Sequence, residues 1–305
     1  MGIFGLSFDD GRMDNYHVAY PILQRYGLPA TFNITTSYIE RKPTKWPFTS
    51  TRAMTMDMVR ELHADPLMEI ASHGYWHNND VDNLLEGIRA LCEHLGVKHL
   101  HERGNGIALT GDTSFSFDAD AAQAQLRAAD VQYVRRSIRL LTHPTLRTFA
   151  RKANRAVALS PLMHYAFSDT LMTEADGMTL YSIPVVGTMP ARVLKAMADL
   201  AIRRNAACIL MLHSVVKDGE MRDFYSLEEK KLTALCEYLH HLRDNGKIEV
   251  ATTMDIINKL KIEFLEQREQ SQTMNETRAE PNLFGLCLER KSSTEGQTCL
   301  NYAES

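Results

Sequence analysis

Short apolar segments recur along this chain, and stretches with helical spacing of apolar residues separate them. The apolar segments are residues 3–8, 30–35, 67–72, 131–134, 179–186, 207–212 and 247–252. The helical stretches are residues 13–26, 56–63, 119–129, 191–204 and 227–244. Short strands that alternate with helices of about 10–15 residues predict βα units around a parallel sheet. The sequence therefore predicts an α/β fold.

The C-terminal part of the chain differs in composition from the rest. Residues 267–280 are rich in Gln, Glu, Thr, Asn and Ser, and residues 281–305 add only short apolar pieces. So little apolar surface cannot offset the entropy that is lost when a segment becomes ordered. We therefore predict one folded domain over residues 1–262 and a disordered polar tail over residues 263–305.

Two local signals mark the ends of the helix predicted at residues 227–244. Ser226 and Glu229 have the spacing of a capping box, in which each side chain accepts a backbone hydrogen bond at the helix start. Gly246 follows the predicted end, where glycine commonly adopts the left-handed conformation that stops a helix.

Charge and cysteine content exclude several classes of protein. The formal net charge is −4, which gives no basic footprint for nucleic acid. The five cysteines are scattered and include no Cys-x-x-Cys pair, so they favour a reducing compartment over a disulfide framework. No apolar run approaches the ~18 residues of a membrane span, and the first residues lack the features of a signal peptide. We expect a cytoplasmic protein that binds no nucleic acid.

Polar side chains follow three of the predicted strands at the point where each strand ends. Asp9 and Asp10 follow the first strand, His73 follows the third, and His213 follows the segment 207–212. The carboxyl ends of parallel barrel strands form one edge, where the active sites of such enzymes lie. The sequence therefore predicts a site that contains all four side chains.

His73 and His77 are four residues apart, so a helical turn after the strand would place both imidazoles on one face. Two histidines and one carboxylate form a common catalytic metal site that leaves a position open for water. Asp9 and Asp10 would point to opposite faces of a strand, but Gly11 permits a sharp turn that brings both to its end. One aspartate would then be a metal ligand and the other a base.

Four segments resemble the motifs of the polysaccharide deacetylases, the NodB homology domain of carbohydrate esterase family 4. The segment Ser-Phe-Asp-Asp-Gly at 7–11 resembles the first motif, Thr-Phe-Asp-Asp-Gly. His-Gly-Tyr-Trp-His at 73–77 is similar to His-(Ser/Thr)-x-x-His, with Gly74 at the Ser/Thr position. Tyr-Gly-Leu-Pro-Ala-Thr-Phe at 26–32 and Leu-Met-Leu-His at 210–213 are similar to two further segments. The resemblance covers about residues 3–258.

The resemblance implies an irregular seven-stranded (β/α) barrel of the NodB-homology type. It implies a general base at Asp9, a general acid at His213 and one divalent metal ion, with zinc expected. The implied metal ligands are Asp10, His73 and His77. The implied activity is hydrolysis of a linear amide, namely an N-acetyl or N-formyl group on an amino sugar of a glycan or glycan precursor. The alternative is a catalytically degenerate barrel of the same family that binds carbohydrate.

Two motifs of the family have no counterpart in this sequence. The third motif, Arg-x-x-Pro-x-Gly, is missing from residues 113–118, and no Asp-Trp pair occurs between residues 131 and 210. The partner of the base and the residue that orients His213 are therefore not identified by motif. Arg103, Arg135 and Arg136 are candidates for the missing arginine, and the sequence does not choose among them.

A basic segment occupies the region where the Asp-Trp motif would lie, because residues 131–168 contain no Asp or Glu. Pro144 suits the first turn of a helix, in which Arg147, Arg151 and Arg155 fall on one face. The stripe is either a solvated helix face or a substrate-binding surface. In the second case it would hold the phosphate of a lipid- or nucleotide-linked sugar, or make a peripheral contact with an anionic membrane.

Overall fold

The computed structural model describes residues 1–42, 52–111, 120–138, 146–154, 160–175, 177–220 and 223–265. They belong to one compact unit, Met1–Leu265. Residues 253–265 form a helix, so the folded part extends at least to residue 265. The predicted tail from residue 266 onward lies outside the described residues. No helix in the described ranges is both long and apolar enough to cross a membrane.

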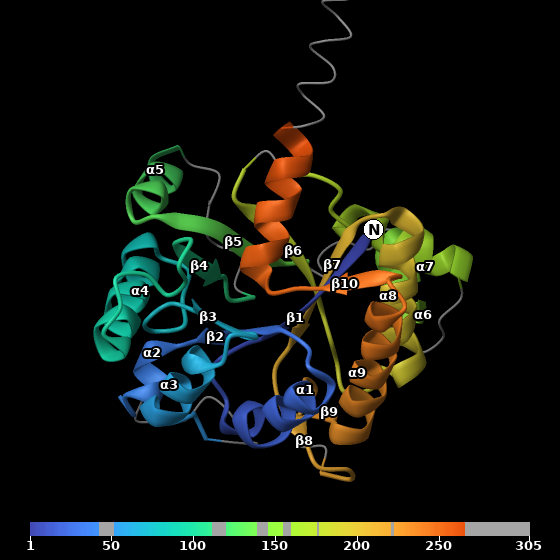
Figure 1. Cartoon of the computed structure of the whole chain (residues 1–305), viewed down its shortest axis with the longest axis horizontal. Helices are drawn as coiled ribbons and strands as arrows, with labels where there is room; N and C mark the ends of the chain where they lie inside the picture. The colour runs from blue at the N-terminus through green and yellow to red at the C-terminus, as the bar shows by residue number, and fades with distance from the viewer. Residues whose placement is uncertain are drawn as a thin grey trace, which may run out of the picture. The chain divides into compact units, whose positions relative to one another are not determined.

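Among the described residues, seven parallel strands close into a barrel (Figure 1). The barrel strands are β1 (Gly2–Phe8), β2 (Ala30–Ile34), β3 (Met68–Ser72), β4 (Asn105–Ala108), β5 (Val131–Ser137), β6 (Thr179–Pro184) and β7 (Ala207–Leu212). They pair in sequence order, and the pairing of β7 with β1 closes the ring. This confirms the predicted irregular seven-stranded (β/α) barrel.

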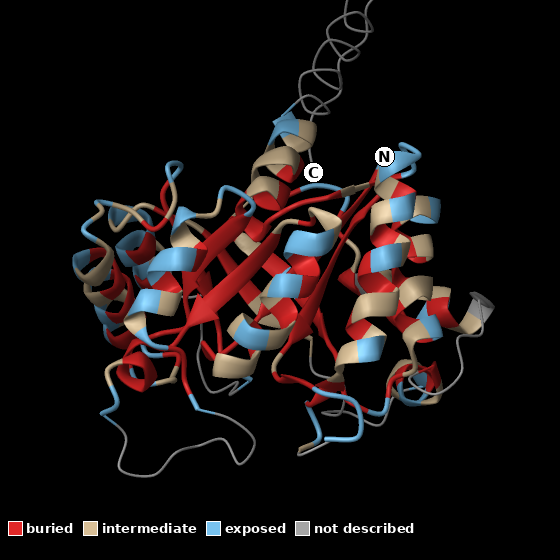
Figure 2. Ribbon diagram, turned by 60° about the horizontal axis from the view of Figure 1, so that its bottom comes forward, coloured by how far each residue is buried: buried red, intermediate tan, exposed pale blue. Residues whose placement is uncertain are grey.

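Helices cover the outside of the barrel, so the strands are buried beneath them (Figure 2). The α-helices are α1 (Tyr20–Tyr26), α2 (Thr36–Ile39), α3 (Met56–Ala64), α4 (Val81–Leu95), α5 (Asp120–Ala128), α6 (Leu146–Asn154), α7 (Ser160–Phe167), α8 (Ala191–Arg204) and α9 (Glu229–Asp244). Shorter elements are a π-helical turn (Asn15–Ala19), a 3-10 turn (Ser168–Thr170), β8 (Val215–Val216), β9 (Leu227–Glu228) and β10 (Ile248–Val250). On β1, Phe4, Leu6 and Phe8 join the large apolar core, because alternate residues of a strand share a face.

The predicted capping box at the start of α9 is wrong. Glu228 is the N-cap and makes no side-chain capping bond, while the Ser226 hydroxyl donates to Asp223 Oδ1 at 2.9 Å. The short strand β9 occupies the position where the box would form, so α9 begins two residues later than predicted. Gly246 has a φ of 64°, which confirms the predicted left-handed residue after the helix.

The interior of the barrel contains a hydrogen-bonded carboxyl group. Glu69 accepts hydrogen bonds from the Tyr133 hydroxyl at 2.7 Å, the Thr31 hydroxyl at 2.8 Å and the backbone N–H of Met254 at 3.0 Å. Burial raises the pKa of Glu69 although these bonds oppose the shift. Met254 belongs to the helix of residues 253–265, so Glu69 and Thr31 tie the start of this helix to the barrel interior.

Gly106 lets Tyr133 occupy the interior, and we expect its replacement to destabilise the fold. A Cβ at Gly106 would lie 2.3 Å from the ring of Tyr133, which is fully buried. Gly106→Ala should lower the free energy of unfolding by about 1–3 kcal/mol, because the core must shift to accept the methyl group. Gly111→Ala is the control, since a Cβ there meets no atom of the described residues within 4 Å. Urea denaturation measures both, and equal midpoints would contradict the expected clash.

Candidate metal and catalytic site

Asp9 and Asp10 stand at the carboxyl end of β1, where the backbone turns sharply. Asp10 has a φ of 79° and Gly11 a φ of 71°, so two successive residues are left-handed. A non-glycine residue rarely adopts this conformation, and such residues cluster at functional sites. Both carboxylates are buried, each only 1% exposed. The sharp turn predicted from the sequence is present, and it begins at Asp10 itself.

His73 and His77 belong to the loop that follows β3, and this loop is not helical. Its backbone is left-handed at Gly74, with a φ of 78°, and at His77, with a φ of 58°. A Cβ at Gly74 would lie 2.6 Å from Asn83 Nδ2, so a serine or threonine does not fit there. The centroids of the two imidazole rings are nevertheless 4.9 Å apart. The expected proximity is therefore present, although the helical turn that would produce it is absent.

One ligand atom from each of Asp10, His73 and His77 converges on a common point, all within 4.8 Å of one another. Asp10 Oδ1 lies 3.1 Å from His77 Nε2 and 3.5 Å from His73 Nε2. Tetrahedral ligands with bonds of about 2.0–2.1 Å lie about 3.3 Å apart. His73 Nδ1 lies 2.8 Å from the carbonyl oxygen of Ala108, an arrangement that leaves Nε2 for a metal. The donor set therefore fits a divalent cation.

Arg12 holds the other carboxylate oxygen of Asp10. Its Nε and Nη2 both lie 2.9 Å from Asp10 Oδ2, and its Nη1 donates to Ser214 Oγ at 2.8 Å. Nη1 also lies 3.4 Å from Asp223 Oδ2. Burial raises the pKa of Asp10, but the neighbouring histidines and Arg12 outweigh it and hold the pKa well below 3.8. Asp10 therefore stays ionised and presents Oδ1 to the histidine pair.

Asp9 is paired with a buried arginine on the far side of the barrel interior. Arg135 Nη2 donates to Asp9 Oδ1 at 2.6 Å, and the side chain of Arg135 is fully buried. Asn33 Nδ2 donates to the same oxygen at 2.8 Å. Of the three arginines considered from the sequence, Arg135 is thus the partner of Asp9, whereas Arg103 pairs with Asp255 at 2.7 Å. Both hydrogen bonds reach Oδ1, which leaves Oδ2 to accept a proton.

His213 follows β7 and packs against an aromatic ring that the sequence motifs did not identify. The ring centroids of His213 and Tyr225 are 4.7 Å apart. Among the described residues, His213 Nδ1 has no hydrogen-bond partner. Burial lowers the pKa of His213 below its ordinary 6.5, although the charges of Asp10 and Asp9 act in the opposite direction. The Tyr225 ring is therefore a neighbour that packs directly on the imidazole of His213.

The three arginines of the predicted basic stripe differ in their surroundings. Arg147 lies over the ring of Tyr165 at 5.3 Å from its centroid. Arg151 is buried, and its Nε donates to the carbonyl oxygen of Ala166 at 2.7 Å because α6 packs against α7. Arg155 lies outside the described residues. The expected exposed stripe therefore does not include Arg151.

Residues 2–150 match the profile of a known protein family, Polysaccharide deacetylase. Over this segment, the chain is similar to the polysaccharide deacetylases. The matched segment contains Asp9, Asp10, His73 and His77 together with Arg135. No curated protein matches this chain.

Solved structures of the family resemble this chain over different lengths. A protein from Mycobacterium smegmatis assigned to the polysaccharide deacetylases is 14% identical, with a TM-score of 0.51, over 97% of this chain and 94% of that one. This likeness supports the fold. IcaB from Ammonifex degensii is 19% identical with a TM-score of 0.34 over 43% of this chain, which spans 58% of that protein. A pseudoenzyme of carbohydrate esterase family 4 from Bacillus anthracis is 11% identical, with a TM-score of 0.42, over 84% of this chain and 66% of that one.

Removal of one partner from the ion pair between Arg135 and Asp9 should strongly destabilise the fold. Arg135→Met leaves the Asp9 carboxylate buried without its cation, which we expect to cost about 3–5 kcal/mol of the free energy of unfolding. Arg136→Met, at the next position of β5, is the control and should cost less, because that side chain is only partly buried. Adding Asp9→Asn to Arg135→Met should restore part of the loss. Additive losses in the double variant would contradict a direct pairing.

The packing of Tyr225 on His213 should be visible in the titration of the imidazole. Because burial lowers the pKa of His213, its NMR signals in protein without added metal should titrate below pH 6.5. Tyr225→Ala admits water to the ring and should therefore move the titration upward. Phe224→Ala, which leaves the Tyr225 ring in place, is the control. If Tyr225→Ala leaves the pKa of His213 unchanged, the burial of this imidazole is due to another group.

Proposed function

We propose that this chain hydrolyses the N-acyl group of an amino sugar with one divalent cation, for which we expect zinc. The single observation that carries the proposal is the arrangement at the end of β1. There Asp9 is fixed by Arg135, while the adjacent Asp10 contributes an oxygen to the His73–His77 pair. The match of residues 2–150 to the polysaccharide deacetylases supports the same reaction.

The residues of the proposed site have separate tasks in this reaction. A cation at Asp10, His73 and His77 would supply a Lewis acid for the acyl carbonyl and the attacking water. Asp9 accepts the proton of the water at Oδ2, since Arg135 and Asn33 hold Oδ1.

His213 is the proposed donor of a proton to the departing amine of the sugar. Its lowered pKa makes the protonated imidazole a stronger acid, but also reduces the protonated fraction at neutral pH. Tyr225 restricts rotation of the imidazole, because its ring packs on that of His213 in a tilted arrangement with an interplanar angle of 36°. Both features support a role for His213 in proton transfer.

Two family motifs are missing from the sequence, but the proposed catalytic residues still have close neighbours. Arg135 binds the proposed base from β5, and Tyr225 packs on the proposed acid from the loop before β9. These contacts favour hydrolysis over the alternative of a degenerate carbohydrate-binding barrel. The cytoplasmic location, and the role of Arg147 and Arg155 in binding a phosphate- or lipid-linked sugar, stay predictions. Arg151 is buried and bonded to Ala166, so we do not propose it as a substrate ligand.

Two adjacent substitutions test the proposal by separating the base from the ligand. Asp9→Asn should retain about one metal ion per chain but lose hydrolysis, because an amide cannot accept the proton. Asp10→Asn should lose both, because an amide is a poor ligand for the cation. Elemental analysis measures the metal, and release of acetate or formate from N-acylated glucosamine oligomers measures hydrolysis. Thermal melting confirms that each variant is folded, and full turnover in Asp9→Asn would rule out its role as the base.

A further inference from the structure

Arg12 follows the sharp turn at Asp10 and Gly11, and the proposed reaction gives this residue no task. Its side chain is buried, with only 6% of its surface exposed. Its backbone pairs with Ala53 in an antiparallel bridge, and the N–H of Met54 donates to the carbonyl oxygen of Gly11 at 2.9 Å. The turn and the bridge therefore fix the position from which the guanidinium reaches its partners.

The guanidinium of Arg12 bonds two different parts of the site through different nitrogens. Nε and Nη2 both lie 2.9 Å from Oδ2 of Asp10, the proposed metal ligand. Nη1 donates to Ser214 Oγ at 2.8 Å and lies 3.4 Å from Asp223 Oδ2. A guanidinium can do this because its five N–H donors point outward from one rigid plane. One cation thus connects the end of β1 with the residues that follow β7.

The second part of the site is the acid loop, which we define as residues 213–220 and 223–227. Ser214 directly follows His213, so its bond to Arg12 holds the chain next to the proposed acid. Asp223 Oδ1 accepts a hydrogen bond from the N–H of Tyr225 at 2.8 Å. The carboxylate that faces Arg12 through Oδ2 therefore also fixes, through Oδ1, the turn that presents the Tyr225 ring to His213.

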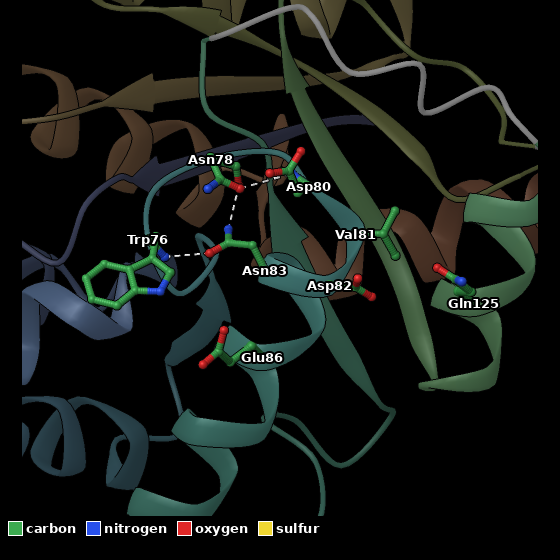
Figure 3. Close-up of a pocket in the computed structure, with 8 residues that line it drawn as sticks. All are labelled: Trp76, Asn78, Asp80, Val81, Asp82, Asn83, Glu86 and Gln125. Carbon is green, nitrogen blue, oxygen red and sulfur yellow. Dashed lines mark hydrogen bonds between the residues drawn. The ribbon is translucent and has the colours of Figure 1, made fainter.

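The loop that carries the two histidines is supported by different contacts (Figure 3). The N–H of Trp76 donates to Oδ1 of Asn83, a residue of α4, at 2.6 Å. Asn83 Nδ2 donates to the carbonyl oxygen of Asn78 at 2.7 Å. His73 and His77 are thus positioned from α4, whereas Arg12 bonds the third proposed ligand. Removal of a histidine should therefore leave the bonds of Arg12 in place.

We propose that Arg12 is a positioning residue that ties the acid loop to Asp10, and so holds the proton donor in register with the metal ligand. The inference rests on the proposed function, because His213 is the donor in that reaction. Arg12 also lies between the carboxylates of Asp10 and Asp223 and compensates both charges. We call its bonds to Ser214 and Asp223 the Arg12 tether.

The tether should matter for the release of an amine and not for the release of a weakly basic group. A sugar amine leaves only when it receives a proton, so the rate depends on the position of the general acid. The phenolate of p-nitrophenyl acetate leaves without a proton. Loss of the tether should therefore slow hydrolysis of the amide much more than hydrolysis of this ester.

A double variant removes the tether and leaves the bonds to the metal ligand in place. Ser214→Ala removes the hydroxyl that accepts from Nη1, and Asp223→Asn removes the charge that faces it. The asparagine keeps an oxygen that can accept from the N–H of Tyr225. Nε and Nη2 of Arg12 keep Asp10 as their partner. We call Ser214→Ala/Asp223→Asn the tether variant.

Amide hydrogen exchange in metal-free protein tests the tether without turnover. The N–H groups of Tyr225 and Leu227 donate to Asp223 Oδ1 and to the carbonyl oxygen of Ser214, so their exchange reports opening of the acid loop. Both should exchange about tenfold faster in the tether variant and in Arg12→Met. Arg12→Lys should restore only part of the protection, because one ammonium does not replace a planar fork of donors.

Two control variants make the exchange result specific. His73→Ala removes a proposed metal ligand but no bond of the tether, so Tyr225 and Leu227 should exchange as in the wild-type protein. Glu220→Gln removes an exposed carboxylate from the same loop and should also leave both rates unchanged.

Turnover by the zinc-loaded protein tests the effect on the acid. The tether variant should keep about one metal ion per chain, because Asp10, His73 and His77 are untouched. Its kcat for release of acetate from N-acetylglucosamine oligomers should fall about tenfold or more, while hydrolysis of p-nitrophenyl acetate stays within about twofold.

Two outcomes would overturn the proposal. One is unchanged exchange of Tyr225 and Leu227 in both the tether variant and Arg12→Met, which would show that the acid loop does not depend on Arg12. The other is an equal loss of activity toward the amide and the ester, which would place the effect outside proton donation. If the wild-type protein hydrolyses neither substrate, the proposed function fails, and hydrogen exchange still decides whether Arg12 holds the loop.

Discussion

The ion pair between Arg135 and Asp9 links opposite walls of the barrel through its interior. Arg135 comes from β5 and is fully buried, and Asp9 comes from the end of β1. A charge in such a place is tolerated when an opposite charge and hydrogen bonds compensate its burial. Among the described residues, only Nε of the Arg135 guanidinium has no hydrogen-bond partner. Ser182 accepts a bond from Arg135 Nη1 at 2.9 Å, and Asn33 donates to Asp9. Four strands thus meet at one polar layer, and the site at the strand ends is built on it.

A second polar layer explains why this interior differs from an ordinary apolar core. Tyr133 precedes Arg135 by two residues, so both side chains point into the barrel. Tyr133 donates to Glu69, and the room for its ring exists because Gly106 has no side chain. The catalytic layer is therefore supported from below by aromatic and carboxyl groups whose positions are fixed by hydrogen bonds.

The sequence predicted the parts of the fold that depend on local patterns. Apolar strands such as β7 and motif residues such as His73 could be found because their signal lies within a few residues. β4 was missed because Asn105 and Gly106 do not resemble a strand, and α4 was missed although Leu84, Ile88 and Leu91 have helical spacing.

The partners of the proposed catalytic residues could not be predicted in the same way. Tyr133 and Val134 are both apolar, so the alternation along β5 does not reveal whether Arg135 or Arg136 faces inward. Tyr225 comes close to His213 only through the path of the loop before β9, which no local pattern specifies.

Strand β1 pairs with three strands, because β10 and β2 share one of its two edges. β7 runs along one side of β1, while β10 pairs with Gly2–Phe4 and β2 pairs with Ser7 and Phe8 on the other side. If β10 came away, an apolar strand edge with unpaired amide and carbonyl groups would face solvent. Such an edge can recruit a strand from another molecule, as in aggregation or domain swapping. A segment of three residues near the end of the folded unit thus covers this part of the edge of β1.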